Sequence, residues 1–235
     1  MANKIFLDLL PVSDVDASGV GATIDIGTVR SAARVRVLSM EWDGVGPVVH
    51  IESSSNETTW RRVGSLALSS VGVEEYVAVG LDRYIRVAWE LTGLSAMLQV
   101  TGTAQQLYAN RADLEALNLG RSQLLRADEQ RVNRALVHAS ELAAGYIGAR
   151  FAMPLVLWGD DLSGHTASVA AYRYMVSVGY APEGSDEHIR MMYDDAIRWF
   201  ERVASGELSP DGIEDSTPDI SEGAPSVVSV KARGW

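Results

Sequence analysis

The feature that most constrains the fold of this chain is a change in the spacing of its apolar residues near residue 104. Before that point, apolar and polar residues alternate in short segments, which is the period of a half-buried β-strand. After it, apolar residues recur every three or four positions, as in an amphipathic helix. The sequence therefore predicts an α+β chain: an all-β sandwich over residues 1–104, a small antiparallel helical bundle over 105–206 and an extended tail over 207–235.

Clusters of Gly, Asp, Asn and Ser divide the first part into short β-prone segments, as in a sandwich. Within residues 34–39 and 84–89 the side chains alternate in character, so each strand should bury one face. Asp43-Gly44 is a turn between two strands, and residues 53–58 form a polar loop. The expected strands cover residues 4–9, 22–25, 33–42, 48–53, 61–68, 75–79, 84–91 and 97–101.

Four helices are expected in the second part. Asn110 can cap a short helix that runs to Leu117. The other helices should cover residues 128–150, 166–178 and 186–205. The longest has an apolar stripe with small residues, Gly145 among them, which would let another helix approach closely. The residues assigned to helix packing are Val132, Leu136, Ala139, Ala143, Tyr146, Tyr172, Tyr193 and Phe200.

The tail has a composition of its own. Between Glu207 and Glu222 it holds acidic residues without a basic one, and prolines break any helix, so a mobile tether is expected. It ends in a β-prone apolar segment, which is typical of a part that docks on another surface. The residues expected to dock are Val227, Val228, Val230, Lys231, Arg233 and Trp235.

Composition excludes several classes of protein. The chain has no cysteine, so disulfides and thiolate sites are ruled out. It has 20 Lys and Arg residues against 31 Asp and Glu, a net charge of −11, which disfavours strong nonspecific adhesion to nucleic acid. We find neither a long apolar run nor a secretion signal, so we expect no membrane partner.

The search for catalytic motifs gives no candidate catalytic residue, metal site or cofactor site. The glycine pairs at 19/21 and 44/46 lack the third glycine of a dinucleotide loop and are interpreted as β-turns. His50, His138, His165 and His188 form no H-x-x-x-H pair that could hold zinc. No pair of carboxylates stands out for glycosidase chemistry. We therefore expect a protein that is not an enzyme.

Two groups of acids could in principle hold a cation. Asp160, Asp161 and His165 form the densest ligand-like cluster, and oxygen ligands in a loop suit a cation. We favour a solvated loop that caps the third helix. Asp14 and Asp16 are likewise interpreted as loop acids.

The helical part is similar to the head-to-tail adaptor proteins of tailed phages and Mu-like prophages. The resemblance begins with Tyr-Ala-Asn-Arg-Ala-Asp-Leu at residues 108–114 and extends over about residues 105–206. Family members usually start close to that segment, so the preceding β-domain has no counterpart and its role does not follow from the resemblance. The further matching segments are 135–141, 145–147, 150–155, 171–174, 193–200 and 203–206.

The resemblance implies a structural protein of the virion neck, assembled in the host cytoplasm. Such a protein forms a homo-oligomeric ring, a dodecamer in the family, beneath the portal protein. It joins the capsid to the tail, contacts a tail-side stopper or tail terminator protein, and lets DNA pass without sequence-specific binding. The docking tail would then bind the portal or a neighbouring copy.

An alternative function is a carbohydrate-binding or surface-decorating β-sandwich module carried on a helical oligomerisation domain. In that case Trp42, Trp60 or Trp89 would stack on a sugar. A third possibility, an enzyme that uses acids of the sandwich, would require a cleft that brings those acids together.

Overall fold

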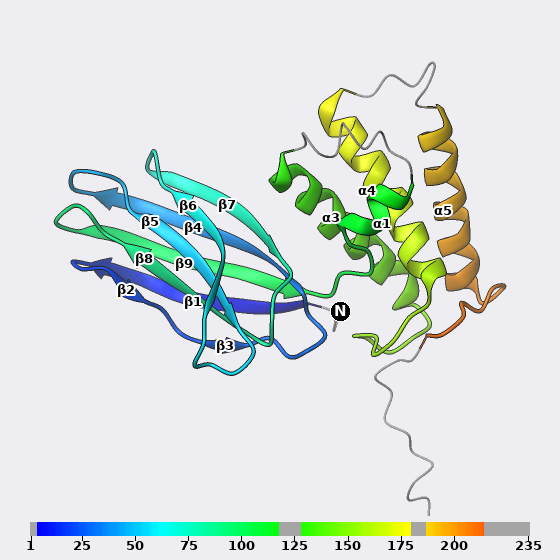
Figure 1. The fold of residues 1–235 in the computed structure, drawn as a ribbon, viewed down its shortest axis with the longest axis horizontal. Coiled ribbons are helices and arrows are strands. Elements are labelled where there is room, and N and C mark those ends of the chain that lie inside the picture. The colour runs from blue at the N-terminus through cyan, green and yellow to red at the C-terminus, as the bar shows by residue number, and fades with distance from the viewer. Residues whose placement is uncertain (1–3, 118–127, 180–186, 214–235) are drawn as a thin grey trace, which may run out of the picture.

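The computed structural model describes residues 4–117, 128–179 and 187–213. Within these residues, nine strands form two antiparallel sheets packed face to face, and four helices lie beyond one end of the strands (Figure 1). The predicted α+β class, with a sandwich first and a helical bundle after it, is confirmed.

The first sheet has the strand order β1-β9-β4-β7, and the second has the order β2-β8-β5-β6, with β3 also paired to β8. Every pair of neighbouring strands is antiparallel. The strands are β1 (Lys4–Val15), β2 (Gly19–Val20), β3 (Ile24–Asp25), β4 (Ala32–Trp42), β5 (Val48–Ser54), β6 (Arg61–Ala67), β7 (Gly72–Val79), β8 (Tyr84–Glu90) and β9 (Ala96–Gln105).

The core of the sandwich follows the alternation read from the sequence. Val35 and Val37 on β4, and Ile85 and Val87 on β8, are fully buried between the sheets. Their neighbours along each strand are more exposed, as period two requires. β-Branched side chains at these alternate positions suit a pleated, half-buried surface, so the sequence itself determines which face turns inward.

Strand β1 is longer than predicted. β1 continues past Leu9 to Val15, with shifts of register on either side of Leu10. As an edge strand it tolerates Pro11, which would disrupt a central strand. Asp14 therefore lies at the end of a strand and not in a loop.

The glycine pairs do not both form turns. Gly44 has a φ of 87° and makes the expected turn between β4 and β5. Gly19 instead belongs to the short strand β2, which the sequence analysis missed. A Cβ atom on Gly19 would lie 2.7 Å from the Trp89 ring, so glycine is required there by close packing.

The helices are α1 (Arg111–Ala116), α3 (Glu129–Ile147), α4 (Asp160–Val178) and α5 (Glu187–Ser205). The predicted cap of α1 is confirmed: Asn110 Oδ1 accepts from the backbone N–H of Ala112 and Asp113. Asp113 accepts in return from the backbone N–H of Asn110, which completes a capping box. The stop signal expected at Gly120 lies outside the described residues.

Two helix boundaries differ from the prediction. α3 ends at Ile147, before the expected end at Arg150, because Gly148 caps it. α4 begins at Asp160, six residues earlier than expected, so Asp160, Asp161 and His165 lie in a helix and not in a loop. The first turn of α4 is mainly polar and shows no helical apolar period, but acidic residues there are favoured by the helix dipole.

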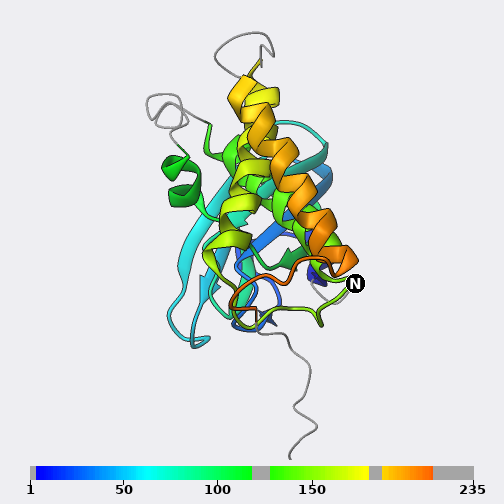
Figure 2. The ribbon, with the colours of Figure 1, turned by 90° about the vertical axis from the view of Figure 1, so that its right-hand side faces the viewer.

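The helical core is organised around α4, which contacts α1, α3 and α5. Figure 2, viewed from the helical end of the molecule, shows α5 crossing in front of α3 and α4. The fully buried residues of this core include Ala139 and Ala143 on α3 and Phe200 on α5. Gly145, expected in the same seam, is exposed, because its position on α3 faces away from the other helices.

The first residues of the expected tether are attached to this core. Leu208 and Ile213 pack against it, and Pro210 is buried. The Arg150 guanidinium also donates to the Leu208 carbonyl at 2.8 Å. Residues 207–213 are therefore not a free tether, because apolar side chains among the acids pack against the helical core.

Candidate functional site

Buried side-chain amides join the sandwich to the helical bundle. Gln105, at the end of β9, donates to the Val137 carbonyl of α3 at 3.0 Å. In the opposite direction, Gln130 of α3 accepts from the Val77 N–H at 2.9 Å and donates to the Val77 carbonyl at 3.2 Å. Asn133 also donates to that carbonyl, at 3.3 Å. Edge strand β7 is therefore capped by α3, and both halves of the chain are held in one orientation.

The connection after β9 is fixed in the same way. Gln106 is fully buried, donates to the Leu155 carbonyl at 2.7 Å and accepts from the Leu155 N–H at 3.1 Å. Two residues further on, the Tyr108 N–H donates to Ser140 Oγ of α3 at 3.1 Å. These contacts lie beside a small apolar cluster shared by both halves, formed by Ala32, Val77, Val137, Val79 and Leu107.

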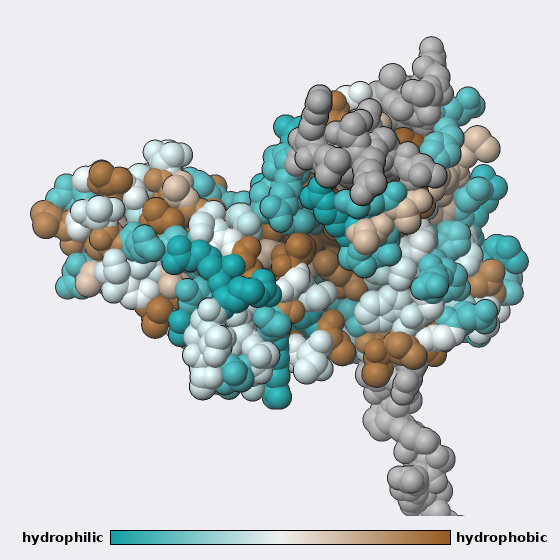
Figure 3. Space-filling model, viewed as in Figure 1, coloured by the Kyte–Doolittle hydropathy of each residue, from teal (hydrophilic) through white to brown (hydrophobic). Residues whose placement is uncertain are grey.

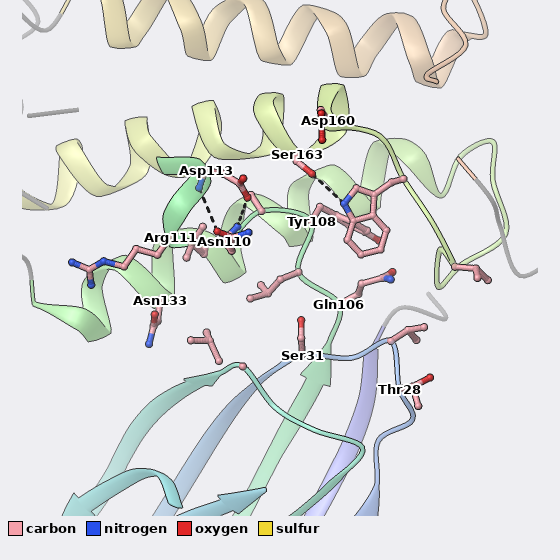
Figure 4. A pocket seen from close by; sticks show the side chains of 18 of the residues that line it. Thr28, Ser31, Gln106, Tyr108, Asn110, Arg111, Asp113, Asn133, Asp160 and Ser163 are labelled. Carbon is pink, nitrogen blue, oxygen red and sulfur yellow. Dashed lines mark hydrogen bonds between the residues drawn. The ribbon is translucent and has the colours of Figure 1, made fainter. Parts of the chain in front are cut away.

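A cleft of about 840 Å³ opens at this junction (Figure 4). Its walls come from the loop before β4, the end of β7, the connection to α1, one face of α3 and the segment that leads into α4. The cleft is therefore built by both halves and depends on the fixed orientation between them.

The inner wall of the cleft is aromatic. The rings of Tyr108 and Trp158 meet edge to face with their centroids 5.3 Å apart, and Trp158 Nε1 donates to Ser163 Oγ at 3.2 Å. Burial raises the pKa of Tyr108 above its ordinary value. Its hydroxyl has no hydrogen-bond partner among the described residues. Tyr108 therefore acts as an apolar wall and not as an acid or base near neutral pH.

Some of the polar side chains that line the cleft have structural partners. Asp113 is used in the capping box of α1, and Arg111 Nε donates to Glu115 at 3.3 Å. None of the residues that line the cleft is a histidine. The cleft offers backbone groups, an aromatic wall and the carboxylates of Asp113, Glu129 and Asp160.

The four histidines lie in separate places. His50 is buried on β5, with Nδ1 2.8 Å from Ser65 Oγ and Nε2 2.9 Å from Glu90. His165 stacks on Trp199 with centroids 4.6 Å apart, and burial lowers its pKa below the ordinary value. His138 is half-buried on α3 and His188 is exposed on α5. The described part of the chain contains no cluster of three or more His, Asp or Glu side chains that could hold a metal ion.

The three tryptophans considered for sugar stacking differ in exposure: Trp89 is buried, whereas Trp42 and Trp60 are half-buried. Trp89 is buried and its indole N–H donates to the Ala17 carbonyl at 2.8 Å. Trp42 packs against the sandwich core. The Arg86 guanidinium lies 4.0 Å from the centre of the Trp60 ring and covers it. Trp89 therefore offers no exposed ring for sugar stacking, and Arg86 occupies one face of the Trp60 ring.

The residues assigned to helix packing all belong to the helical core or pack against it. The ring centroids of Tyr146 and Phe200 lie 5.8 Å apart, and those of Tyr172 and Tyr193 lie 4.3 Å apart. The buried members are Val132, Leu136, Ala139, Ala143 and Phe200. The residues assigned to docking, Val227, Val228, Val230, Lys231, Arg233 and Trp235, lie outside the described residues.

Exposed apolar side chains gather at the end of the sandwich that lies away from the helices (Figure 3). Val45, Val71 and Leu94 lie in the loops that connect β4 to β5, β6 to β7 and β8 to β9. Exposed apolar patches of this kind often mark contact surfaces. Among the described residues, no helix has the length and apolar character needed to cross a membrane.

Comparison with known proteins relates the helical part of the chain to bacteriophage proteins. A family model described as "Bacteriophage Mu, Gp36" matches residues 97–229, more than half of the chain. The chain belongs to this family. The match begins in strand β9 and includes all four described helices, so β1 to β8 lie outside it.

Two curated relatives come from Mu and a Mu-like prophage. "Gene product J" of Escherichia phage Mu is 32% identical over 117 residues, which are 46% of this chain and 77% of the relative. "Mu-like prophage FluMu protein gp36" of Haemophilus influenzae is 35% identical over 82 residues, which are 35% of this chain and 54% of the relative.

Solved structures resemble the chain only distantly. A chain from Bacillus endospore appendages covers 45% of this chain with a TM-score of 0.25 and 13% identity. A CBM29-2 mutant complexed with cellulohexaose also covers 45%, with a TM-score of 0.27 and 7% identity. Similarity at this level carries no argument about function.

Proposed function

We propose that this protein is a structural component of a phage virion, a head-to-tail adaptor that forms a ring beneath the portal. The observation that carries the proposal is the family match, which covers the whole described helical bundle and joins it to proteins of phage Mu and a Mu-like prophage. The ring would join capsid to tail and let DNA pass from one to the other.

The architecture supports assembly into a ring. A ring requires a heterologous contact in which one surface of a copy meets a different surface of the next. The buried amides hold the sandwich and the bundle in one orientation, so every copy presents the same surfaces. A chain that docks on its neighbours also gains stability by mass action.

The charge of the chain supports a role beside passing DNA. A net charge of −11 repels phosphates. A lumen lined by such a protein would not grip the duplex, and DNA could move through without sequence-specific binding. In this assembly, the portal protein lies on the head side, a stopper or tail terminator on the tail side, and the ring is a dodecamer in the virion neck.

In this proposal, the valines at 227, 228 and 230 and the terminal tryptophan bind the portal or a neighbouring copy. A β-prone segment can add to a sheet edge through main-chain hydrogen bonds, with side chains in pockets that set the register. The family match extends to residue 229 and so includes two of these valines.

The test is co-purification of the chain with the portal protein encoded by the same phage genome. The full chain should be retained on the portal. A chain without residues 224–235 should keep its helical circular dichroism and melting temperature but should not be retained. A control chain in which residues 224–235 are replaced by the same number of Gly and Ser residues should also not be retained on the portal. If the full chain is not retained, the adaptor function is wrong; if the truncated chain is retained, the tail is not the docking element.

A further inference from the structure

Three adjoining hollows form a continuous groove where α3 and α4 meet the outer face of the sheet β1-β9-β4-β7. Their volumes are about 180, 560 and 540 Å³. The first shares Lys4 and Glu141 with the second, and Arg34 with the third. We call this surface the basic groove. It lies on the face of α3 opposite the cleft: His138 and Glu141 line the groove, whereas Asn133 and Leu136 line the cleft.

The basic groove carries a positive charge on a strongly acidic chain. Six basic side chains line it against two carboxylates, Glu75 and Glu141, although the whole chain has a net charge of −11. The six are Lys4, Arg34, Arg36, Arg131, Arg134 and Arg173.

The two carboxylates do not neutralise the groove. Glu75 lies 3.1 Å from Arg36 and 3.8 Å from Arg34. Glu141 lies 3.9 Å from Arg34 and 2.8 Å from Lys4. Each carboxylate is therefore shared between two cations in a ladder along the groove.

At the other end of the ladder, Arg134 and Arg173 make no ion pair or hydrogen bond with any described residue. His138 lines the same hollow, and the positive charge around it contributes to a lowered pKa. Burial lowers its pKa first, and Arg173, Arg34 and Lys4 lower it further against the opposing effect of Glu141.

The shape of the groove suits an extended peptide. Its floor contains Gly102 of β9, where a Cβ atom would lie 2.5 Å from the Arg34 carbonyl. Beyond Lys4 its wall is apolar and shallow, because small residues of α3 lie there beside Met153. The groove thus has a cationic part for carboxylates and an adjoining apolar part without bulky side chains.

We propose that the basic groove binds the acidic segment 214–222 of a second copy of this chain. The inference deepens the proposed function, because such a contact would link neighbouring copies in the ring. The segment carries Glu214, Asp215, Asp219 and Glu222 and no basic residue, so its charge is complementary to the groove. It is followed by the valine-rich end, which could reach the apolar part.

The position of Ile213 favours a neighbouring copy over the same chain. Asp211 and Gly212 contact Gly159, the residue between Trp158 and Asp160 of the cleft wall. The chain therefore leaves the described part on the cleft side of α3, whereas the groove lies on the opposite face.

A peptide fits the groove better than nucleic acid does. Double-stranded DNA presents about one negative charge per 1.7 Å along its axis, a charge density that the six basic side chains, three of them paired with Glu75 and Glu141, do not match. A segment with four carboxylates within nine residues can instead place them beside Arg134 and Arg173, which pair with neither glutamate.

The experiment uses full-length chains with reversed charges. The groove variant carries Arg134→Glu and Arg173→Glu. The tail variant carries Glu214→Lys, Asp215→Lys, Asp219→Lys and Glu222→Lys. The control variant carries Arg190→Glu and Arg198→Glu, two exposed arginines of α5. Light scattering at 50 and 500 mM salt measures self-association, and circular dichroism checks that each variant is folded.

The wild-type and control chains should self-associate at low salt and dissociate at high salt. The groove and tail variants should each associate at least about tenfold more weakly, the effect expected for lost charge-assisted hydrogen bonds. An equal mixture of the two variants should regain association, because the acidic tail of the groove variant fits the unchanged groove of the tail variant, and the reversed pair also matches.

A monomeric wild type, unchanged association of the folded groove variant, or a mixture that remains monomeric overturns the proposal. DNA binding is checked with a 30-base-pair duplex. If the duplex binds the wild type but not the groove variant, and the tail variant assembles normally, the groove binds DNA and the proposal is overturned. These outcomes leave the adaptor function intact if the wild-type chain is still retained on the portal. Loss of portal binding by the wild type would instead contradict the adaptor function.

Discussion

Single side-chain amides determine how the two halves of this protein are placed. Gln106 is the clearest case, because the N–H and the carbonyl of its side-chain amide pair with the backbone carbonyl and N–H of Leu155, which is itself fully buried. An apolar side chain of similar size would fill the same space but would leave a buried N–H and a buried carbonyl without partners.

We expect Gln106→Leu to lower the free energy of unfolding by roughly 1–3 kcal/mol for each buried group left unpaired. Urea denaturation of the full chain measures the effect. The matched control is Gln99→Leu in β9, the strand that ends just before Gln106. The Gln99 side chain is only half-buried and makes no hydrogen bond to a described residue. Equal, small effects of the two substitutions would show that the Gln106 amide does not hold the junction.

His165 should make stability depend on pH. Its folded pKa lies below the ordinary value of 6.5, mainly because it is buried against Trp199, so the unfolded chain takes up the proton more readily. Stability should therefore be constant above the unfolded pKa and decrease as the pH falls below it. Thermal melts at pH 7.5 and 5.5 should show a smaller decrease for His165→Gln than for wild type, and the exposed control His188→Gln should behave as wild type. A decrease unchanged in His165→Gln would remove this histidine as a cause.

Residue-level contacts of this kind were largely beyond reach from the sequence. The spacing of the apolar residues changes from the strand period to the helix period near residue 104. Nothing in that change reveals that the side chains of Gln105 and Gln106 are buried at that point. Asn110 and Asp113 were predictable, because a capping box depends only on local spacing. Gln105, Gln106 and Gln130 pair across long sequence separations, and only the assembled fold brings their partners near.

At the scale of elements, the sequence predicted strands and helices where one face is buried and the other is wet. It misplaced the start of α4, where the first turn is mainly polar, and missed β2, where glycine is needed for packing against Trp89. It also treated residues 207–213 as a free tether, because the acidic composition concealed Leu208 and Ile213. The average composition of a segment does not show the contacts that one or two of its apolar side chains make.

The alanine stripe of α3 gives a prediction at this scale. Ala139 and Ala143 are fully buried against the neighbouring helices, so Ala139→Leu and Ala143→Leu should each cost roughly 1–3 kcal/mol through overpacking. The control is Gly145→Ala, since a Cβ atom there meets nothing within 4 Å. It should stabilise the helix by roughly 0.5–1 kcal/mol. Thermal melts that move in the same direction for all three would place the packing seam elsewhere.

The whole molecule combines a fixed junction between its two halves with two different surfaces. The cleft lies on one face of α3 and the basic groove on the other, so one copy can present distinct surfaces to two neighbours. The resemblance in the helical half located the family, which the match over residues 97–229 now shows. The role of the sandwich could not be predicted, because β1 to β8 lie outside that match.

Cryo-electron microscopy of virions whose genome encodes this chain tests the central claim most directly. The adaptor function predicts a closed ring of copies between the portal and the tail, with the DNA path through its centre and the junction of sandwich and bundle as described. A neck whose density excludes this fold, or copies of the chain found on the capsid surface or on the tail tube, would contradict it.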